Sequence, residues 1–153
     1  MKRKRLYIDV CTLCRPFDDQ NIMRIRLETD AFYLILQSIR EGHYNMVVSQ
    51  VHIEEIKGIE DICERSELMT LLNNLGVNSS CNLLKVRERA EHFVSLKLGV
   101  ADAAHLAFAE ATADVFITCD DKLLKKSKRS NLMNNLKIQS VSPLEFCAME
   151  DLK

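Results

Sequence analysis

Two sets of residues near the start of the chain have the types and spacing of a chemical site. In the stretch LYIDVCTLC, residues 6–14, Cys11 and Cys14 form a C-x-x-C pair, while Asp9 is an acid that follows an apolar run. A C-x-x-C pair can act as a redox couple or supply two metal ligands. An acid at the carboxyl end of a parallel strand lies instead where open α/β sheets bind their ligands.

The cysteine pair lacks the partners that either chemistry needs. A thioredoxin-like site requires a cis-proline facing the thiols, but the prolines are Pro16, within the same loop, and Pro143, far along the chain. A zinc site requires further ligands at ordered spacing, and the sequence holds no second C-x-x-C and no H-x3–5-H pair. We therefore expect Cys11 and Cys14 to be structural or incidental thiols.

Acids occur at three further positions beside predicted elements. Glu54 and Glu55 lie in the helical pattern SQVHIEEIKG, Asp102 opens an alanine-rich helical run, and Asp120 follows the apolar run VFITC. Taken singly, each has an ordinary structural role: a solvated helix face for the two glutamates, a favourable first-turn charge for Asp102, and an N-cap for Asp120.

Taken together with Asp9, these acids predict a different chemistry. Clusters of oxygen ligands without histidine are what Mg²⁺ and Mn²⁺ prefer. Carboxylates gathered in one cleft would repel one another and take up protons unless a divalent ion neutralised them. Such an ion orients and activates water for phosphodiester hydrolysis and stabilises the charge on the leaving oxygen.

Alternating strands and helices must position these acids. Apolar, β-rich runs occupy residues 5–10, 45–49, 115–119 and 137–141. Helical patterns occupy residues 28–41, 50–57, 59–75, 82–98, 101–113 and 120–127, and another begins at Pro143. Continuously apolar runs are typical of parallel strands that are covered on both faces. The pattern predicts an α/β fold with a central, mostly parallel sheet flanked by helices, and the two consecutive helices after residue 58 indicate a helical arm.

Length and composition narrow the class of protein. A chain of 153 residues without a linker or repeat is expected to form a single domain over residues 1–153. The net charge of −1 excludes the global basic field of many nucleic-acid binders, so a polyanion would need a local patch. Charges interrupt every apolar run before it reaches the length of a membrane span, and LYIDV is too short for a signal peptide. We expect a cytoplasmic protein without a membrane partner.

The acids and their neighbours resemble the PIN domain family. The matching features are Asp9-x-x-x-Leu13, Ser49 six residues before Glu55-Ile56, ADAAHLAFA with Asp102, and ITCDDKLLK with Thr118 and Asp120. The order and spacing resemble those of PIN nucleases, including the VapC toxins of toxin–antitoxin pairs. The resemblance runs from residue 5 to about residue 147, and RPFDDQ is similar to a less familiar bacterial and archaeal subgroup.

The resemblance implies a metal-dependent endoribonuclease with a PIN-like three-layer sandwich. One or two Mg²⁺ or Mn²⁺ ions would be held by four catalytic acids: Asp9, Glu55, Asp102 and Asp120. Thr118 matches a hydroxyl that often supports the fourth acid, and the spacing from Ser49 favours Glu55 over Glu54 as the ligand. Cys11 departs from the pattern, since many members carry Asn or Ser there, and this change is expected to affect metal affinity or preference.

The segment KLLKKSKR, residues 122–129, gives the chain a local basic patch directly after Asp120. Lys122, Lys125 and Lys126 are candidates for binding RNA phosphates beside the metal site, and the alternative is a solvated helix face.

Two other side chains have a structural and a functional interpretation. Arg15 is a further candidate for RNA binding, and the alternative is an ion pair with Asp18 or Asp19. His105 lies one turn after Asp102 and is either a packed core residue or part of the site.

The resemblance also implies partners, and it leaves rival functions open. RNA is the expected substrate, an antitoxin protein is the partner that a toxin would have, and PIN-like proteins commonly form twofold dimers. The apolar helices around residues 28–41 and 59–75 are candidates for the homodimer contact. One rival is an inactive PIN domain that binds RNA or a protein. A phosphate-handling α/β enzyme is a more distant rival, because the run Asp9-Val10-Cys11 lacks the second acid of a haloacid-dehalogenase-type site.

Overall fold

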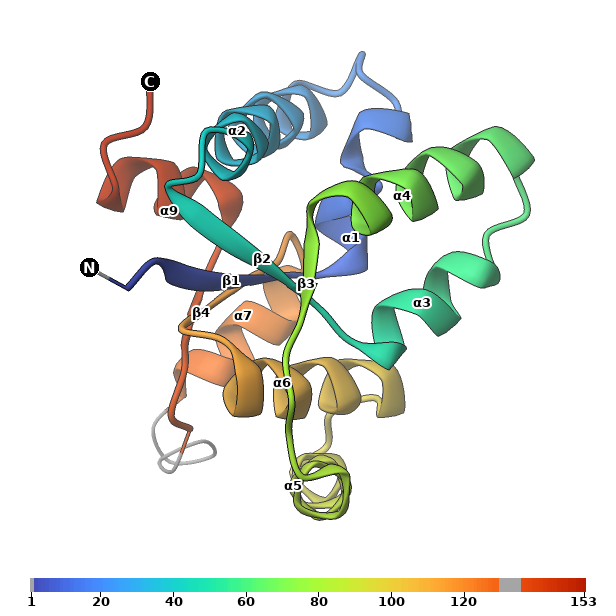
Figure 1. Cartoon of the computed structure of the whole chain (residues 1–153), viewed down its shortest axis with the longest axis vertical. Coiled ribbons are helices and arrows are strands. Elements are labelled where there is room, and N and C mark those ends of the chain that lie inside the picture. The colour runs from blue at the N-terminus through green and yellow to red at the C-terminus, as the bar shows by residue number, and fades with distance from the viewer. Residues whose placement is uncertain (1, 130–135) are drawn as a thin grey trace.

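The central strand of a parallel sheet carries the first of the predicted acids at its carboxyl end. The computed structural model describes residues 2–129 and 136–153. Within these ranges five parallel strands lie in the order β3-β2-β1-β4-β5. They span Lys4–Ile8 (β1), Tyr44–Val48 (β2), Gly76–Asn78 (β3), Val115–Ile117 (β4) and Gln139–Val141 (β5). Asp9 therefore directly follows the middle strand (Figure 1).

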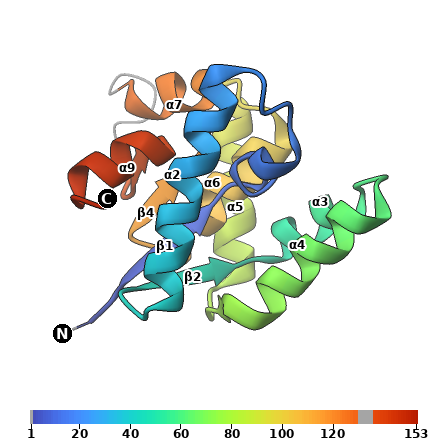
Figure 2. The same cartoon turned by 90° about the horizontal axis from the view of Figure 1, so that it is seen from above.

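Helices cover both faces of the sheet and complete a three-layer sandwich, as Figure 1 and Figure 2 show from two directions. One layer consists of α1 (Val10–Leu13), α2 (Met23–Arg40), α4 (Ile62–Leu75) and α9 (Pro143–Met149). The other consists of α5 (Leu83–Ser95), α6 (Val100–Thr112) and α7 (Asp121–Lys128). A 3-10 turn, Arg15–Phe17 (η1), follows α1, and α3 (Gln50–Lys57) follows β2 at the carboxyl edge of the sheet.

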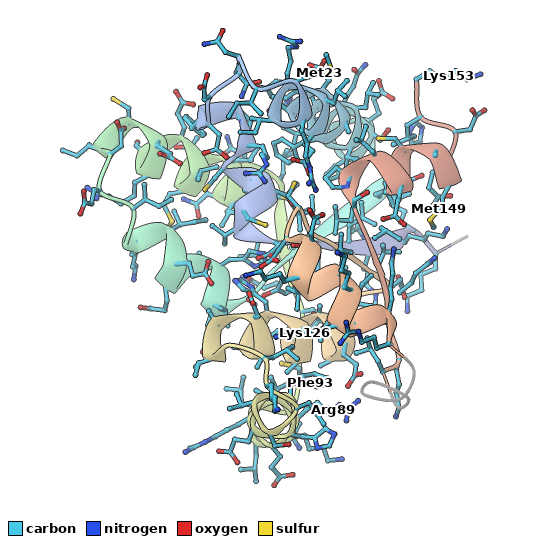
Figure 3. All side chains as sticks on the ribbon, turned by 180° about the vertical axis from the view of Figure 1, so that it is seen from behind. Met23, Arg89, Phe93, Lys126, Met149 and Lys153 are labelled. Atoms are coloured by element: carbon cyan, nitrogen blue, oxygen red, sulfur yellow. The ribbon has the colours of Figure 1, made fainter. Side chains whose placement is uncertain are left out.

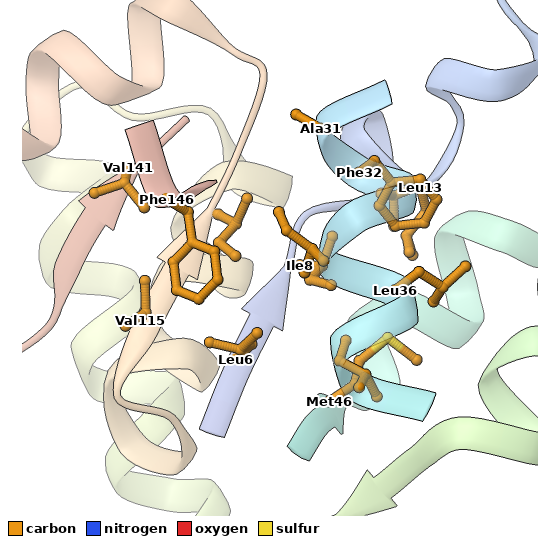
Figure 4. Packing of buried hydrophobic residues seen from close by; sticks show 14 of the residues in the cluster. Leu6, Ile8, Leu13, Ala31, Phe32, Leu36, Met46, Val115, Val141 and Phe146 are labelled. Carbon is orange, nitrogen blue, oxygen red and sulfur yellow. The ribbon is translucent and has the colours of Figure 1, made fainter. Parts of the chain in front are cut away.

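Alternation along β1 divides the apolar core between the two layers, because successive side chains of a strand point to opposite faces. Leu6 and Ile8 pack with Phe32 in the layer of α2 and α9 (Figure 4). Tyr7 packs with Phe116 in the layer of α5, α6 and α7. The phenol of Tyr7 is thereby buried beneath α6, two residues before Asp9.

The predicted α/β fold class, with its flanked parallel sheet, is confirmed. Every predicted helix forms, although α2 begins earlier than expected, at Met23. The strands β1, β4 and β5 are shorter than the predicted runs, whereas β2 keeps its predicted length and begins one residue earlier. β1 ends at Ile8 and leaves Asp9 beyond the ladder. In the part of the chain that the structure describes, no helix combines the length and the apolar character needed to cross a membrane.

A strand that the sequence pattern missed changes the predicted helical arm. Gly76 was expected only to end a helix, but it also begins β3, which pairs with β2. A Cβ atom at Gly76 would collide with the Val48 side chain and the Leu72 carbonyl, so glycine is required where α4 turns into this strand. Because β3 lies between α4 and α5, the two helices do not form one arm, and they cover opposite faces of the sheet (Figure 1).

Candidate functional site

Asp9 is held at the end of β1 by residues that follow β4. Its backbone N–H donates to the Ile117 carbonyl at 2.8 Å and continues the pairing of the two strands. Thr118 Oγ1 donates to Asp9 Oδ2 at 2.7 Å and accepts from the Asp120 backbone N–H at 3.1 Å. The Asp9 side chain is buried. Thr118 therefore joins the first and the fourth of the predicted acids.

Glu55 extends from α3 toward Asp9, and the ring of His105 lies between the two carboxyl groups. His105 Nε2 lies 2.8 Å from Glu55 Oε1 and 3.7 Å from Asp9 Oδ1. The hydrogen bond from His105 holds the pKa of Glu55 below its ordinary value. Glu54 is exposed to solvent, so the structure agrees with the choice of Glu55. His105 belongs to the site and is also fully buried, so its two interpretations are compatible.

Asp102 and Asp120 enter this region from the first turn of α6 and the start of α7. Burial raises the pKa of the Asp102 carboxyl group, and the charges of Asp9 and then Asp120 raise it further. Glu55 makes a weaker contribution in the same direction. Such repulsion acts at close range. Asp120 is also the N-cap of α7, its Oδ1 accepting from two backbone N–H groups, so its predicted structural role is confirmed.

The donor chemistry of these acids fits a hard divalent ion, although the side chains do not surround one point. Among the residues that the structure describes, no three His, Cys, Asp or Glu side chains are close enough together to hold a metal ion. Carboxylate oxygens are nevertheless the ligands that Mg²⁺ and Mn²⁺ prefer, and a cation would relieve the repulsion felt by Asp102. The convergence of all four acids on one ion stays a prediction.

A buried chain of hydrogen bonds behind Glu55 was not predicted from the sequence. Tyr7 OH lies 2.7 Å from Ser49 Oγ and 2.6 Å from His105 Nδ1. The Glu55 carboxylate can only accept, so Nε2 of His105 carries a proton, and in the neutral form of the ring Nδ1 then accepts from Tyr7. Donation therefore runs from Ser49 through Tyr7 and His105 to Glu55. This order fixes both the tautomer and the orientation of the imidazole.

His52 ties the same chain to the backbone of β1. Its Nδ1 accepts from the Ser49 backbone N–H at 3.0 Å, and its Nε2 donates to the Ile8 carbonyl at 2.7 Å. Burial and the nearby His105 lower the pKa of His52 to about 4, so the ring is neutral at physiological pH. The sequence signal was the spacing S-x-x-H, in which histidine replaces the acid or amide of a capping box.

Cys11 and Cys14 have thiols that hold their protons. All six cysteines are free. A hydrogen bond with Cys119, together with burial, raises the pKa of Cys11 far above its ordinary value, and burial raises that of Cys14 to about 12. Protonated thiols are weak nucleophiles and weak metal ligands. Cys11 Sγ lies 3.4 Å from Asp9 Oδ2, so this residue borders the acid and does not replace it.

The lysines of α7 differ in what they contact. Lys126 Nζ donates to the Lys97 carbonyl at 2.9 Å, in the connection between α5 and α6 (Figure 3). Lys122 and Lys125 are exposed on the helix that Asp120 caps. Lys122 and Lys125 therefore suit phosphate binding better than Lys126 does.

Arg15 is engaged within the protein. Its guanidinium pairs with Asp18 at 2.8 Å and with the buried Glu28 at 3.1 Å. The predicted ion pair with Asp18 is confirmed, and this contact directs Arg15 toward α2. Its candidacy as an RNA ligand is weakened accordingly, because binding a phosphate would compete with both carboxylates.

Comparison with known proteins adds no family assignment. No protein-family model matches this chain, and no curated protein matches it. The resemblance to PIN domains therefore rests on the spacing of the acids and on the arrangement of the sheet that carries them.

Proposed function

We propose that this protein is a Mg²⁺- or Mn²⁺-dependent endoribonuclease of the PIN type that hydrolyses RNA phosphodiester bonds. One observation carries the proposal: acids from three distant segments are joined at one sheet edge. Asp9 is linked to Glu55 across His105 and to Asp120 through Thr118. A purely structural role does not explain why the fold places mutually repelling carboxylates together.

In the proposed mechanism, Asp9, Glu55, Asp102 and Asp120 would hold the divalent ion by their carboxylate oxygens. The bound ion would supply activation of water and neutralisation of charge at the phosphate. Glu55 has a lowered pKa and stays deprotonated at neutral pH, which suits a metal ligand better than a proton acceptor, because a lowered pKa weakens a carboxylate as a base. His105 keeps this carboxylate oriented through the bond from Nε2. Exposed lysines of α7 would bind the flanking phosphates.

The resemblance to VapC proteins supports a narrower proposal, that the nuclease is a toxin paired with an antitoxin protein. A small antitoxin-like gene directly upstream would support this proposal. Nuclease activity that has no effect on growth when the protein is expressed alone in a bacterium would argue against it.

A second function is favoured by one specific observation, the engagement of Glu55 by His105 without a third close ligand in the described residues. In a PIN domain that binds RNA or a protein without catalysis, Glu55 would stay hydrogen-bonded to His105 and would never bind a metal ion. The two functions differ in their response to metal, because only the nuclease requires a divalent ion.

Thermal melting with Mn²⁺, Mg²⁺ and EDTA tests metal binding directly. An ion that binds only the folded chain should stabilise it by about 2.7 kcal/mol at a hundredfold excess over Kd. Asp9→Asn should lose most of this gain while remaining as stable as the wild type in EDTA. Asp30→Asn, at an exposed position of α2, is the matched control and should keep the gain. A wild-type protein that shows no metal-dependent shift would favour the binding module.

A further inference from the structure

A separate pocket lies at the carboxyl edge of the same sheet, beyond β2 and β3. Its volume is about 610 Å³, and it is bordered by residues of α3, α4, the loop after β3, and α6. Figure 1 shows where these elements lie. Its walls include Gln50, Asn73, Asn78, Ser79, Ser80 and Phe108. A pocket of this size suits a small molecule or one unit of a polymer.

The walls of this pocket are uncharged, which is unexpected for this chain. None of the described residues that line it is Asp, Glu, Lys or Arg, although 28% of the sequence consists of these types. A phosphate or a metal ion in this pocket would meet no charged side chain among the described lining residues, so the walls suit an uncharged polar ligand better. Its walls combine amides and hydroxyls with the ring of Phe108. Such groups match the hydrogen-bonding edges and the stacking face of a nucleobase.

The pocket adjoins the acids through α3. Gln50 and Glu55 belong to the same helix and lie about 7.5 Å apart along its axis, at a rise of 1.5 Å per residue. Ser49 also lines the pocket, and its hydroxyl begins the hydrogen-bonded chain that reaches Glu55. Five residues also turn about 140° around the helix axis, so Glu55 lies on another side of α3 from Gln50, and an RNA strand would pass around α3 between the pocket and the acids.

We propose that this pocket binds one nucleobase of a single-stranded RNA while a phosphate further along the same strand lies at the acids. The inference rests on the proposed nuclease function and adds the part of the protein that would recognise the base sequence of the RNA. The acids and the lysines of α7 would contact the sugar-phosphate backbone of the RNA, which is the same for every nucleotide. The side-chain amides of Gln50, Asn73 and Asn78 offer hydrogen-bond donors and acceptors that distinguish base edges.

The test measures binding in EDTA, so that it does not depend on cleavage. Fluorescence anisotropy compares labelled hexamers of adenine, cytosine and uracil ribonucleotides with a ribose-phosphate hexamer that lacks bases. We expect at least one base-bearing hexamer to bind about tenfold more tightly than the abasic one, because stacking and edge contacts are lost without the base. Phe108→Leu should remove most of this preference.

Adjacent asparagines on α4 provide a matched pair of variants. Asn73 lines this pocket, whereas Asn74 lines a different one, and both side chains are exposed, so neither substitution threatens the core. Asn73→Ala should weaken the preferred hexamer about fivefold, the effect of one net hydrogen bond. Asn74→Ala should leave its affinity unchanged.

Equal binding of the abasic and base-bearing hexamers would overturn the proposal, and so would equal effects of the two asparagine variants. The outcome is separable from that of the nuclease proposal. Base-dependent binding at Asn73 without cleavage in any divalent ion would remove the nuclease and keep the pocket. Metal-dependent cleavage without base-dependent binding would keep the nuclease and remove the pocket.

Discussion

Substituting Tyr7 with Phe tests the hydrogen-bonded chain that orients Glu55. The ring would remain in the core, where Tyr7 is 0% exposed, and only the hydroxyl would be lost. That hydroxyl lies 2.7 Å from Ser49 Oγ and 2.6 Å from His105 Nδ1. Ser49 keeps its contact with His52, but Nδ1 of His105 becomes a buried acceptor without a donor. An unpaired buried group costs about 1–3 kcal/mol, so we expect a loss of about 2 kcal/mol.

For a domain of this size, that loss should lower the Tm by roughly 4–8 °C. Metal affinity should also fall, by at most about the 10- to 100-fold that removing the direct partner of a ligand costs, because Tyr7 acts on Glu55 through His105. Nitrogen NMR of His105 in the metal-free protein gives a readout that is independent of activity. The wild type should show one tautomer, protonated at Nε2, and Tyr7→Phe a mixture of the two.

Tyr33→Phe is the matched control, because Tyr33 is 51% exposed on α2, which covers the face of the sheet opposite to α6 and His105. This control should change the stability by no more than about 0.5 kcal/mol. Equal melting temperatures for the two variants, with an unchanged His105 tautomer in Tyr7→Phe, would refute the chain of hydrogen bonds.

Three further predictions address pH, repulsion and assembly. Burial and the nearby His105 lower the pKa of His52 from 6.5 to about 4, so the contribution of the neutral ring to stability is complete above pH 6.5 and is lost as the pH falls toward 4. Denaturant unfolding should show that the free energy of unfolding falls by about 3 kcal/mol over this pH range. The loss should be much smaller in His52→Gln. Asp102→Asn should melt no lower than the wild type in EDTA, because it relieves the repulsion that raises the Asp102 pKa, and it should gain less stability from Mn²⁺ in the same melting series. A homodimer contact on α2 would use the exposed side chains of Met23 and Tyr33, and a 17.6 kDa species in sedimentation at micromolar concentration would contradict the predicted homodimer.

The parts of the site that sequence patterns predicted are those set by local rules. The apolar run before Asp9 predicted a buried strand, and in a parallel sheet this places the acid at the carboxyl edge. Ser49 has the type of an N-cap residue, and its hydroxyl caps α3 at the start of the predicted helix 50–57. Asp120 follows the same rule at α7. These residues could be placed because each depends on its own segment.

The parts that were missed depend on contacts between distant segments. Tyr7 reads as one more apolar residue of β1, and only the packing of α6 against the sheet brings His105 to its hydroxyl. The strand that begins at Gly76 has three residues, too few for a hydrophobic pattern, and its pairing with β2 defines it. The α2 segment FYLILQSI illustrates the same limit: the predicted dimer surface is largely core, including Phe32 and Ile35.

Cleavage of a labelled single-stranded RNA by the purified protein tests the central claim most directly. The account predicts cleavage in Mg²⁺ or Mn²⁺ that EDTA abolishes, that Asp9→Asn removes, and that Asp30→Asn, Cys11→Ser and Cys14→Ser largely retain. Contamination by another nuclease would give equal activity in wild type and Asp9→Asn preparations. Intact RNA in every divalent ion, or cleavage that survives both EDTA and Asp9→Asn, would contradict the metal-dependent nuclease.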